Sequence, residues 1–390
     1  MREIYLDEAA TSKSNIIKRT TIADIVSHYI NVKWHNPSAN YKPAHWIRGE
    51  VERARHVVAD FISANPEEIF FTSGGSESNC WAIKGFVDQY FCENDRGEPV
   101  IITTSIEHKS IMDCISSPAL HAKVIELPVF SDGTVKHHEL AKALAENHGR
   151  KILVSIQFAN NEIGTIQNIK EISQIVHSYN AILHTDAVQA FGHLYIDVNE
   201  LGIDLLSASG HKIGAPKGIG FLYKRSGINI QPLIHGSQMD GMRGGTENVP
   251  YIIALAEAVN MADSSKQAAL LGIRESFIDQ LLARGCTLNG PYTRRLANNI
   301  NVTFPDGVYS ESLLFLLESA GIYASAGSAC NSQSIKPSHV LKAIGLSDKE
   351  AARTLRFTLP DNIAPDDIHY VLSEIDKAIK ILTYEGDDCM

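Results

Sequence analysis

The hydrophobic and polar positions of the chain follow helical spacing in some segments and strand spacing in others. Residues 47–62 repeat apolar side chains at steps of four and three, as an amphipathic helix does. This stripe consists of Ile47, Val51, Ala54, Val58 and Phe61. A short strand is predicted at 68–72, and a second helix is predicted from about Ser76. The chain therefore begins to alternate between helix and strand at an early point.

Short β-rich runs continue along the chain, with helical segments between many of them. Several runs are apolar at nearly every position, which is typical of strands that are covered on both faces. They lie at 100–104, 124–128, 152–158, 181–185, 204–208 and 219–223. The alternation predicts an α/β fold in which helices cover both sides of a mainly parallel sheet.

The pattern changes past about residue 255. A long helix-like stretch is followed by segments of mixed type, which predict a smaller C-terminal α+β domain. They are a helix at 251–283, a strand at 299–304, a helix at 311–319, a strand at 354–358 and a periodic final helix from Ile368 to Leu382. We expect residues 16–255 to form a large domain, and residues 1–15 and 256–390 to form the small domain.

Composition and charge exclude several classes of protein. The 390 residues carry 35 Lys and Arg against 45 Asp and Glu, and this acidic balance disfavours nucleic-acid binding. The first residues show no apolar secretory segment, and no run of about 18 apolar residues predicts a membrane span. The six cysteines are sparse and form no CxxC pair, so we expect reduced thiols in a cytoplasmic protein.

Lys212 lies in the segment with the most chemical signals, Ser-Gly-His-Lys-Ile-Gly at 209–214, directly after an apolar run. A lysine amine attacks carbonyl groups only after losing its proton, which burial or a neighbouring cation favours. A surface loop is the ordinary alternative for such a lysine. Asp186 also ends an apolar strand, and a buried carboxylate needs a partner such as a protonated ring nitrogen. Its alternative role is to cap the next helix.

Two further segments have features of binding or reactive loops. The glycine-rich turn at 72–78 passes from a strand to a helix, where backbone N–H groups can hold an anion, although a plain turn is the commoner meaning. Cys330 lies among small polar residues, as an accessible thiol does. His108 follows the run at 100–104. The sixteen histidines show no paired metal spacing, so no metal site is expected.

Nine segments in order along the chain resemble the signatures of one family, the cysteine desulfurases. These are pyridoxal 5′-phosphate (PLP) enzymes of the aspartate-aminotransferase fold type I, and the loop at 325–330 is similar to that of class I members. The segments are Tyr5–Thr11, Phe71–Asn79, Glu107–Ser110, Asn160–Gly164, Asp186–Gln189, Ser209–Lys212, Arg243–Asn248, Ser325–Cys330 and Leu355–Phe357.

The resemblance implies a role for each matching residue. Lys212 would bind PLP covalently, Asp186 would pair with the ring nitrogen, and Gln189 would hydrogen-bond the ring hydroxyl group. His108 would stack on the ring and move protons. The phosphate would lie against Gly75, Ser76, Ser209 and His211, with Thr246 supplied by the neighbouring subunit of a homodimer. Asn161 and Arg356 would hold the carboxylate of the substrate.

The implied reaction converts L-cysteine to L-alanine and leaves the sulfur on Cys330 as a persulfide. A sulfur-acceptor protein would then take it for iron–sulfur cluster or thiocofactor assembly. Two alternatives stay open: a selenocysteine lyase or aminotransferase-like PLP enzyme, and a degenerate sulfur-relay paralogue. The chain departs from the family pattern at Glu8, Ala215, residues 237–240 and Pro360, none of which is a named catalytic group.

Overall fold

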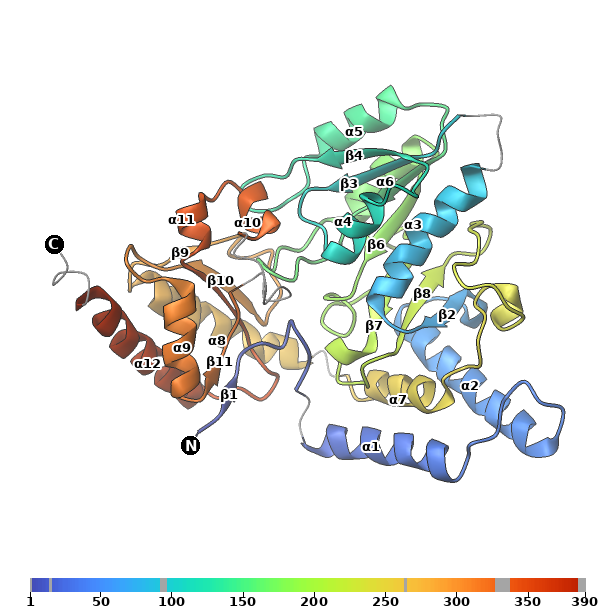
Figure 1. The fold of residues 1–390 in the computed structure, drawn as a ribbon, viewed down its shortest axis with the longest axis horizontal. Coiled ribbons are helices and arrows are strands. Elements are labelled where there is room, and N and C mark those ends of the chain that lie inside the picture. Colours follow the sequence, from blue (N-terminus) through green and yellow to red (C-terminus); the bar gives the residue numbers. More distant parts are fainter. Residues whose placement is uncertain (1, 14–15, 92–96, 263–264, 327–336, 385–390) are drawn as a thin grey trace.

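The computed structural model describes residues 2–13, 16–91, 97–262, 265–326 and 337–384. Cys330 lies outside these ranges. A larger body contains the central sheet and its helices, and a smaller body contains the chain's N-terminal strand and its C-terminal elements (Figure 1). Within the described ranges, the structure has no helix long and apolar enough to cross a membrane.

The larger body is built on a seven-stranded sheet with the order β2-β8-β7-β6-β5-β3-β4. Neighbouring strands from β7 to β4 pair in parallel, and β8 runs antiparallel to both of its neighbours. The strands are β2 (Ile69–Thr72), β3 (Val100–Thr104), β4 (Lys123–Leu127), β5 (Ile152–Ser155), β6 (Ile182–Asp186), β7 (Leu205–Ser209) and β8 (Gly220–Lys224). The expected mainly parallel sheet is confirmed.

Helices cover both faces of this sheet because its strands are apolar on both faces. In β3, Val100 and Ile102 pack into the core shared with α2, α5, α6 and α7, whereas Ile101 packs on the opposite face with α3 and α4. The helices are α1 (Ile16–Asn31), α2 (Lys42–Phe61), α3 (Gly75–Phe91), α4 (Lys109–Ile115), α5 (His137–Glu146), α6 (Ile169–Ser178) and α7 (Val249–Asn260).

The smaller body has its own apolar core, which takes in Ile4 and Leu6 from the start of the chain. Its antiparallel sheet has the order β12-β10-β9, and β1 pairs in parallel with β11. The elements are β1 (Ile4–Tyr5), α8 (Ser265–Leu282), β9 (Thr287–Leu288), β10 (Asn299–Thr303), α9 (Ser310–Ser319), β11 (Ile322–Tyr323), α10 (His339–Ala343), α11 (Asp348–Ala351), β12 (Thr354–Thr358) and α12 (Pro365–Tyr384).

One predicted element is wrong in its extent. The expected continuous helix at 251–283 is two helices, α7 and α8, and α7 already ends at Asn260. The two helices bury their apolar residues in different cores, since Leu255 and Val259 pack in the larger body and Phe277 and Ile278 in the smaller one. A single straight helix cannot present its stripe to both bodies.

Candidate active site

A cavity of about 380 Å³ opens at the carboxyl ends of the parallel strands. Such an edge is where open α/β sheets bind ligands, because loops from neighbouring strands meet there. The cavity takes in every predicted site residue of the large domain except Thr246, together with Arg356 from β12. Those that line it are Gly75, Ser76, His108, Asn161, Asp186, Gln189, Ser209, His211, Lys212 and Arg356.

Lys212 ends a 3₁₀ turn, Gly210–Lys212, that directly follows β7. Its amine does not extend into bulk solvent, because Nζ donates hydrogen bonds to the backbone oxygens of Ala9 at 2.5 Å and Ala10 at 2.8 Å. The side chain lines the cavity together with Asp186. The surface-loop alternative for this lysine is therefore wrong.

Asp186 ends β6 and is 5% exposed. Its Oδ2 accepts a hydrogen bond from Asn79 Nδ2 at 2.7 Å, and its Oδ1 accepts one from the backbone N–H of Val188 at 2.9 Å. The carboxylate therefore caps the turn that follows β6 and also lines the cavity. Two fixed donors hold the carboxylate in one orientation.

His108 is the N-cap residue of α4, and its ring lines the same cavity. Nδ1 accepts a hydrogen bond from the backbone N–H of Ser110 at 3.1 Å, so the neutral ring carries its proton on Nε2. Burial lowers the pKa of His108, and Lys212 and His339 lower it further, whereas Asp186 opposes the shift. The ring is therefore neutral near pH 7.

An anion cup lies where α3 begins. A neighbouring cavity includes the turn at 73–77 and shares Gly75, Ser76, Ser209 and His211 with the first cavity. The helix N-terminus presents backbone N–H groups there. Gly75 permits the close approach, since a Cβ atom at this position would lie 2.5 Å from Cγ2 of Val188. Next to the cup, Arg243 pairs with Glu77 at 2.9 Å.

Arg356, at 4% exposure, forms the cationic end of the cavity. Its Nη1 donates to the backbone oxygen of Asn161 at 3.0 Å, and its Nη2 pairs with Asp7 Oδ1 at 2.6 Å. Within the described residues, its buried Nε has no hydrogen-bond partner. A buried donor without a partner costs free energy, so Arg356 retains an unused hydrogen-bonding capacity beside the cavity.

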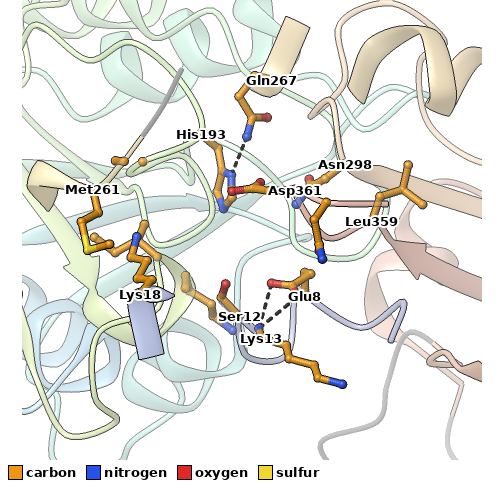
Figure 2. Close-up of a pocket in the computed structure, with 15 residues that line it drawn as sticks. Glu8, Ser12, Lys13, Lys18, His193, Met261, Gln267, Asn298, Leu359 and Asp361 are labelled. Carbon is orange, nitrogen blue, oxygen red and sulfur yellow. Dashed lines mark hydrogen bonds between the residues drawn. The ribbon is translucent and has the colours of Figure 1, made fainter. Parts of the chain in front are cut away.

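A second cavity, of about 260 Å³, lies at the junction of the two bodies (Figure 2). Lys212 also lines this cavity. Glu8 and Asp361 belong to its wall, together with His193, whose Nδ1 lies 3.2 Å from Gln267 Nε2. Burial raises the pKa of Glu8 to about 7, although the backbone N–H of Lys13 donates to this carboxyl group at 3.0 Å. Glu8 therefore titrates near neutral pH.

Two predicted residues do not appear in the cavity. Thr246 is exposed and lines neither the first cavity nor the anion cup. Cys330 lies outside the described residues. Sequence reasoning also missed Asn79 and Asp7, which hold Asp186 and Arg356. Both residues lie inside segments that resemble the family signatures. Their polar side chains near the ends of a strand and a helix were the sequence feature that could have indicated their roles.

Comparisons with known proteins give one consistent result. The family model described as aminotransferase class-V matches residues 4–371. A protein of Methanosarcina thermophila named cysteine desulfurase IscS is 43% identical over 98% of this chain and 93% of its own length. A solved structure titled NIFS-like protein superimposes with a TM-score of 0.88 and 32% identity over 98% of this chain and all of its own.

A second solved structure, titled SspA in complex with cysteine, is 34% identical, with a TM-score of 0.80 over 93% of this chain and all of its own. The relatives match nearly end to end, and the matched region includes every residue of the cavity described above. The chain therefore belongs to the class-V aminotransferase family and, within that family, to the cysteine desulfurases.

Proposed function

We propose that the protein is a PLP-dependent cysteine desulfurase, which converts L-cysteine to L-alanine and keeps the sulfur on Cys330 as a persulfide. The observation that carries this proposal is the pair Lys212 and Asp186, an amine and a buried carboxylate that line one cavity. The similarity to proteins named cysteine desulfurase supports the choice of cysteine as the substrate.

The residues of the cavity fit PLP. An amine for the aldehyde (Lys212), a carboxylate for the protonated ring nitrogen (Asp186) and an amide for the ring hydroxyl group (Gln189) line it together. The N-terminus of α3, with Ser76 and its neighbours, would bind the phosphate group. When bound, PLP supplies an aldehyde group and an electron-accepting ring, and the protein supplies orientation and electrostatics.

The residues of the cavity would have different roles in the reaction. Asp186 would stabilise positive charge at the ring nitrogen, and Asn79 and the Val188 N–H fix the orientation of its carboxylate. Arg356 would bind the substrate carboxylate and help to exclude water from it. Lys212 and His108 would move protons near the substrate Cα, since a neutral imidazole can take and return a proton near pH 7.

Cys330 would act as the thiolate that takes the sulfur from the substrate, and an acceptor protein would then take it from Cys330. We assign residues 16–255 to the PLP-binding domain, and residues 1–15 and 256–390 to the domain that carries the Cys330 loop; the separate apolar cores support this division. We further propose that the protein works in the cytoplasm, in keeping with the free thiols of Cys80, Cys114 and Cys286.

We also propose a homodimer in which Thr246 of one protomer completes the phosphate site of the other. Thr246 is exposed, whereas Arg243 of the same loop is tied to the first turn of α3 by Glu77. The loop therefore starts at the chain's own anion cup and presents an exposed hydroxyl group away from it.

Alanine formation tests the function directly. The purified protein with PLP should release alanine from L-cysteine, and Cys330→Ala should lose this activity while still binding PLP. Cys389→Ala, a cysteine variant at the penultimate position of the sequence, is the control and should retain the activity. Alanine formation by Cys330→Ala at the wild-type rate would refute the role of Cys330, and its absence from the wild type would refute the function.

A further inference from the structure

Two cysteines outside the described mechanism lie together beside the active site. Cys80 is on α3 and Cys114 is on α4, and both line a cavity of about 510 Å³. The two thiols are close enough to interact with each other. Cys114 is buried and Cys80 is half-buried, so the cavity reaches Cys80 more readily.

The charges around the pair make the two thiols unequal. Lys84 lies one helical turn after Cys80 on the same face of α3. The hydrogen bond from Cys114 and then the charge of Lys84 lower the pKa of Cys80 to about 7, against burial, which raises it. The pKa of Cys114 is raised. Lys109, Asp113 and His108 are the other titratable groups on the cavity wall.

This cavity adjoins the active-site cavity. Ser76, His108 and Ser110 line both of them, so a small molecule at the thiol pair lies next to the residues that contact the cofactor space. A thiolate with a second thiol in contact is the arrangement that exchanges sulfur, since one thiol attacks and the other resolves the product.

We propose that Cys80 and Cys114 form a second sulfur-handling site, which accepts the outer sulfur of a small-molecule persulfide and releases it as sulfide. This proposal rests on the proposed function, because a cysteine desulfurase generates persulfide sulfur. The substrate class is a hydropersulfide of a small thiol, and the site lies beside the cavity that binds cysteine.

The chemistry balances in two steps. The Cys80 thiolate attacks the outer sulfur of the persulfide, which forms a Cys80 persulfide, breaks the donor's S–S bond and releases the donor thiol. Cys114 then loses its proton and attacks the Cys80 sulfur, which forms the Cys80–Cys114 disulfide and expels hydrosulfide. The two thiols are oxidised and the transferred sulfur is reduced, and an external dithiol restores the pair.

The test uses full-length, PLP-loaded Cys330→Ser protein, glutathione persulfide as the probe, and peptide mass mapping. We expect a Cys80–Cys114 disulfide and an equal amount of sulfide. The double variant Cys330→Ser/Cys114→Ser should retain one extra sulfur atom on Cys80 and release no prompt sulfide. The double variant Cys330→Ser/Cys80→Ser should form neither the disulfide nor sulfide. Cys114→Ala is the second variant if the serine destabilises the core.

A measurement without core variants gives an independent check. Cys80 should be alkylated by iodoacetamide at least about tenfold faster than Cys286 at pH 7, because burial raises the pKa of Cys286 to about 12. Unchanged Cys80 and Cys114 peptides after persulfide treatment, or extra sulfur equally on Cys286, would overturn the proposal. These measurements do not depend on alanine formation. The proposed function is tested separately, by alanine formation from L-cysteine with the wild-type protein.

Discussion

Single residues of the site are held by neighbours that take no part in the chemistry. Asn79 and the Val188 N–H orient Asp186, and Ser110 sets the tautomer of His108. Buried charges need such partners, because an unpaired charge at low dielectric is expensive. The same reasoning applies to Glu8, whose burial outweighs its hydrogen bond to the Lys13 N–H.

Glu8 should make the stability of the protein depend on pH. Its folded pKa of about 7 lies above the ordinary value of 4.5, so the folded state binds the proton more tightly. The contribution of Glu8 to the free energy of unfolding is therefore fully present below its ordinary pKa and is lost as the pH rises through about 7. In Glu8→Gln, the decrease in the free energy of unfolding with rising pH should be smaller than in the wild type by on the order of 1–3 kcal/mol.

Urea unfolding at pH 5 and pH 8 measures this effect. Wild-type protein should lose more stability between the two pH values than Glu8→Gln does. Exposed Glu146 offers the control substitution, Glu146→Gln, which should behave as wild type. Equal pH dependence in the wild type and Glu8→Gln would show that Glu8 is already ionised in the folded protein.

The sequence predicted which residues line the cavity better than it predicted which residues hold them in place. Lys212 and Asp186 lie in local patterns that can be read from neighbouring residues, whereas Arg356 was singled out by the family resemblance. The structure brings all three to one cavity. Asp7 meets Arg356 across 349 positions of the chain. That contact depends on the N-terminal segment packing beside β12, which no local pattern indicates.

At the scale of secondary-structure elements, the start of α3 is the part that positions a ligand. The turn from β2 into α3 brings Gly75 against Val188, where there is no room for a Cβ atom. Gly75→Ala should therefore force the turn away from Val188 at a cost of about 1–3 kcal/mol. Binding of PLP should weaken about tenfold or more, because the anion cup moves with the turn.

A fluorescence titration of the cofactor-free protein with PLP measures this loss. Gly272→Ala is the matched control, since Gly272 lies in α8 and a Cβ atom there meets nothing within 4 Å. The control should bind PLP as wild type does and be stabilised by up to ~1 kcal/mol. Unchanged affinity of Gly75→Ala would mean that the cup does not hold the phosphate.

Several elements were predicted from their apolar spacing, and others were not. The apolar stripe from Ile47 to Phe61 lies within α2, and the buried strand runs form the central sheet. Helix α1 was missed because most of its side chains are exposed and therefore form no clear apolar stripe. Among its described side chains, only Ile22 and Tyr29 are buried. The break between α7 and α8 reflects the meeting of two cores, which periodicity does not reveal.

At the scale of the whole molecule, the proposed dimer has a sharp test in mixed subunits. Thr246→Ala should bind PLP more weakly, and adding Lys212→Ala protein should restore activity, because its intact Thr246 serves the neighbour's Lys212 site. Adding the double variant Lys212→Ala/Thr246→Ala should restore nothing. If light scattering shows a monomer and this monomer has full activity and full PLP content, the shared site is contradicted.

The most direct measurement asks where the cofactor is attached. Reduction of the PLP-loaded protein with borohydride, followed by peptide mapping, should place the pyridoxyl group on Lys212 alone, and Lys212→Ala should carry none. Lys217, which lines the adjoining anion cup, is an internal control. Labelling of Lys217 or another lysine, with Lys212 unmodified, would contradict the assignment of this cavity as the active site.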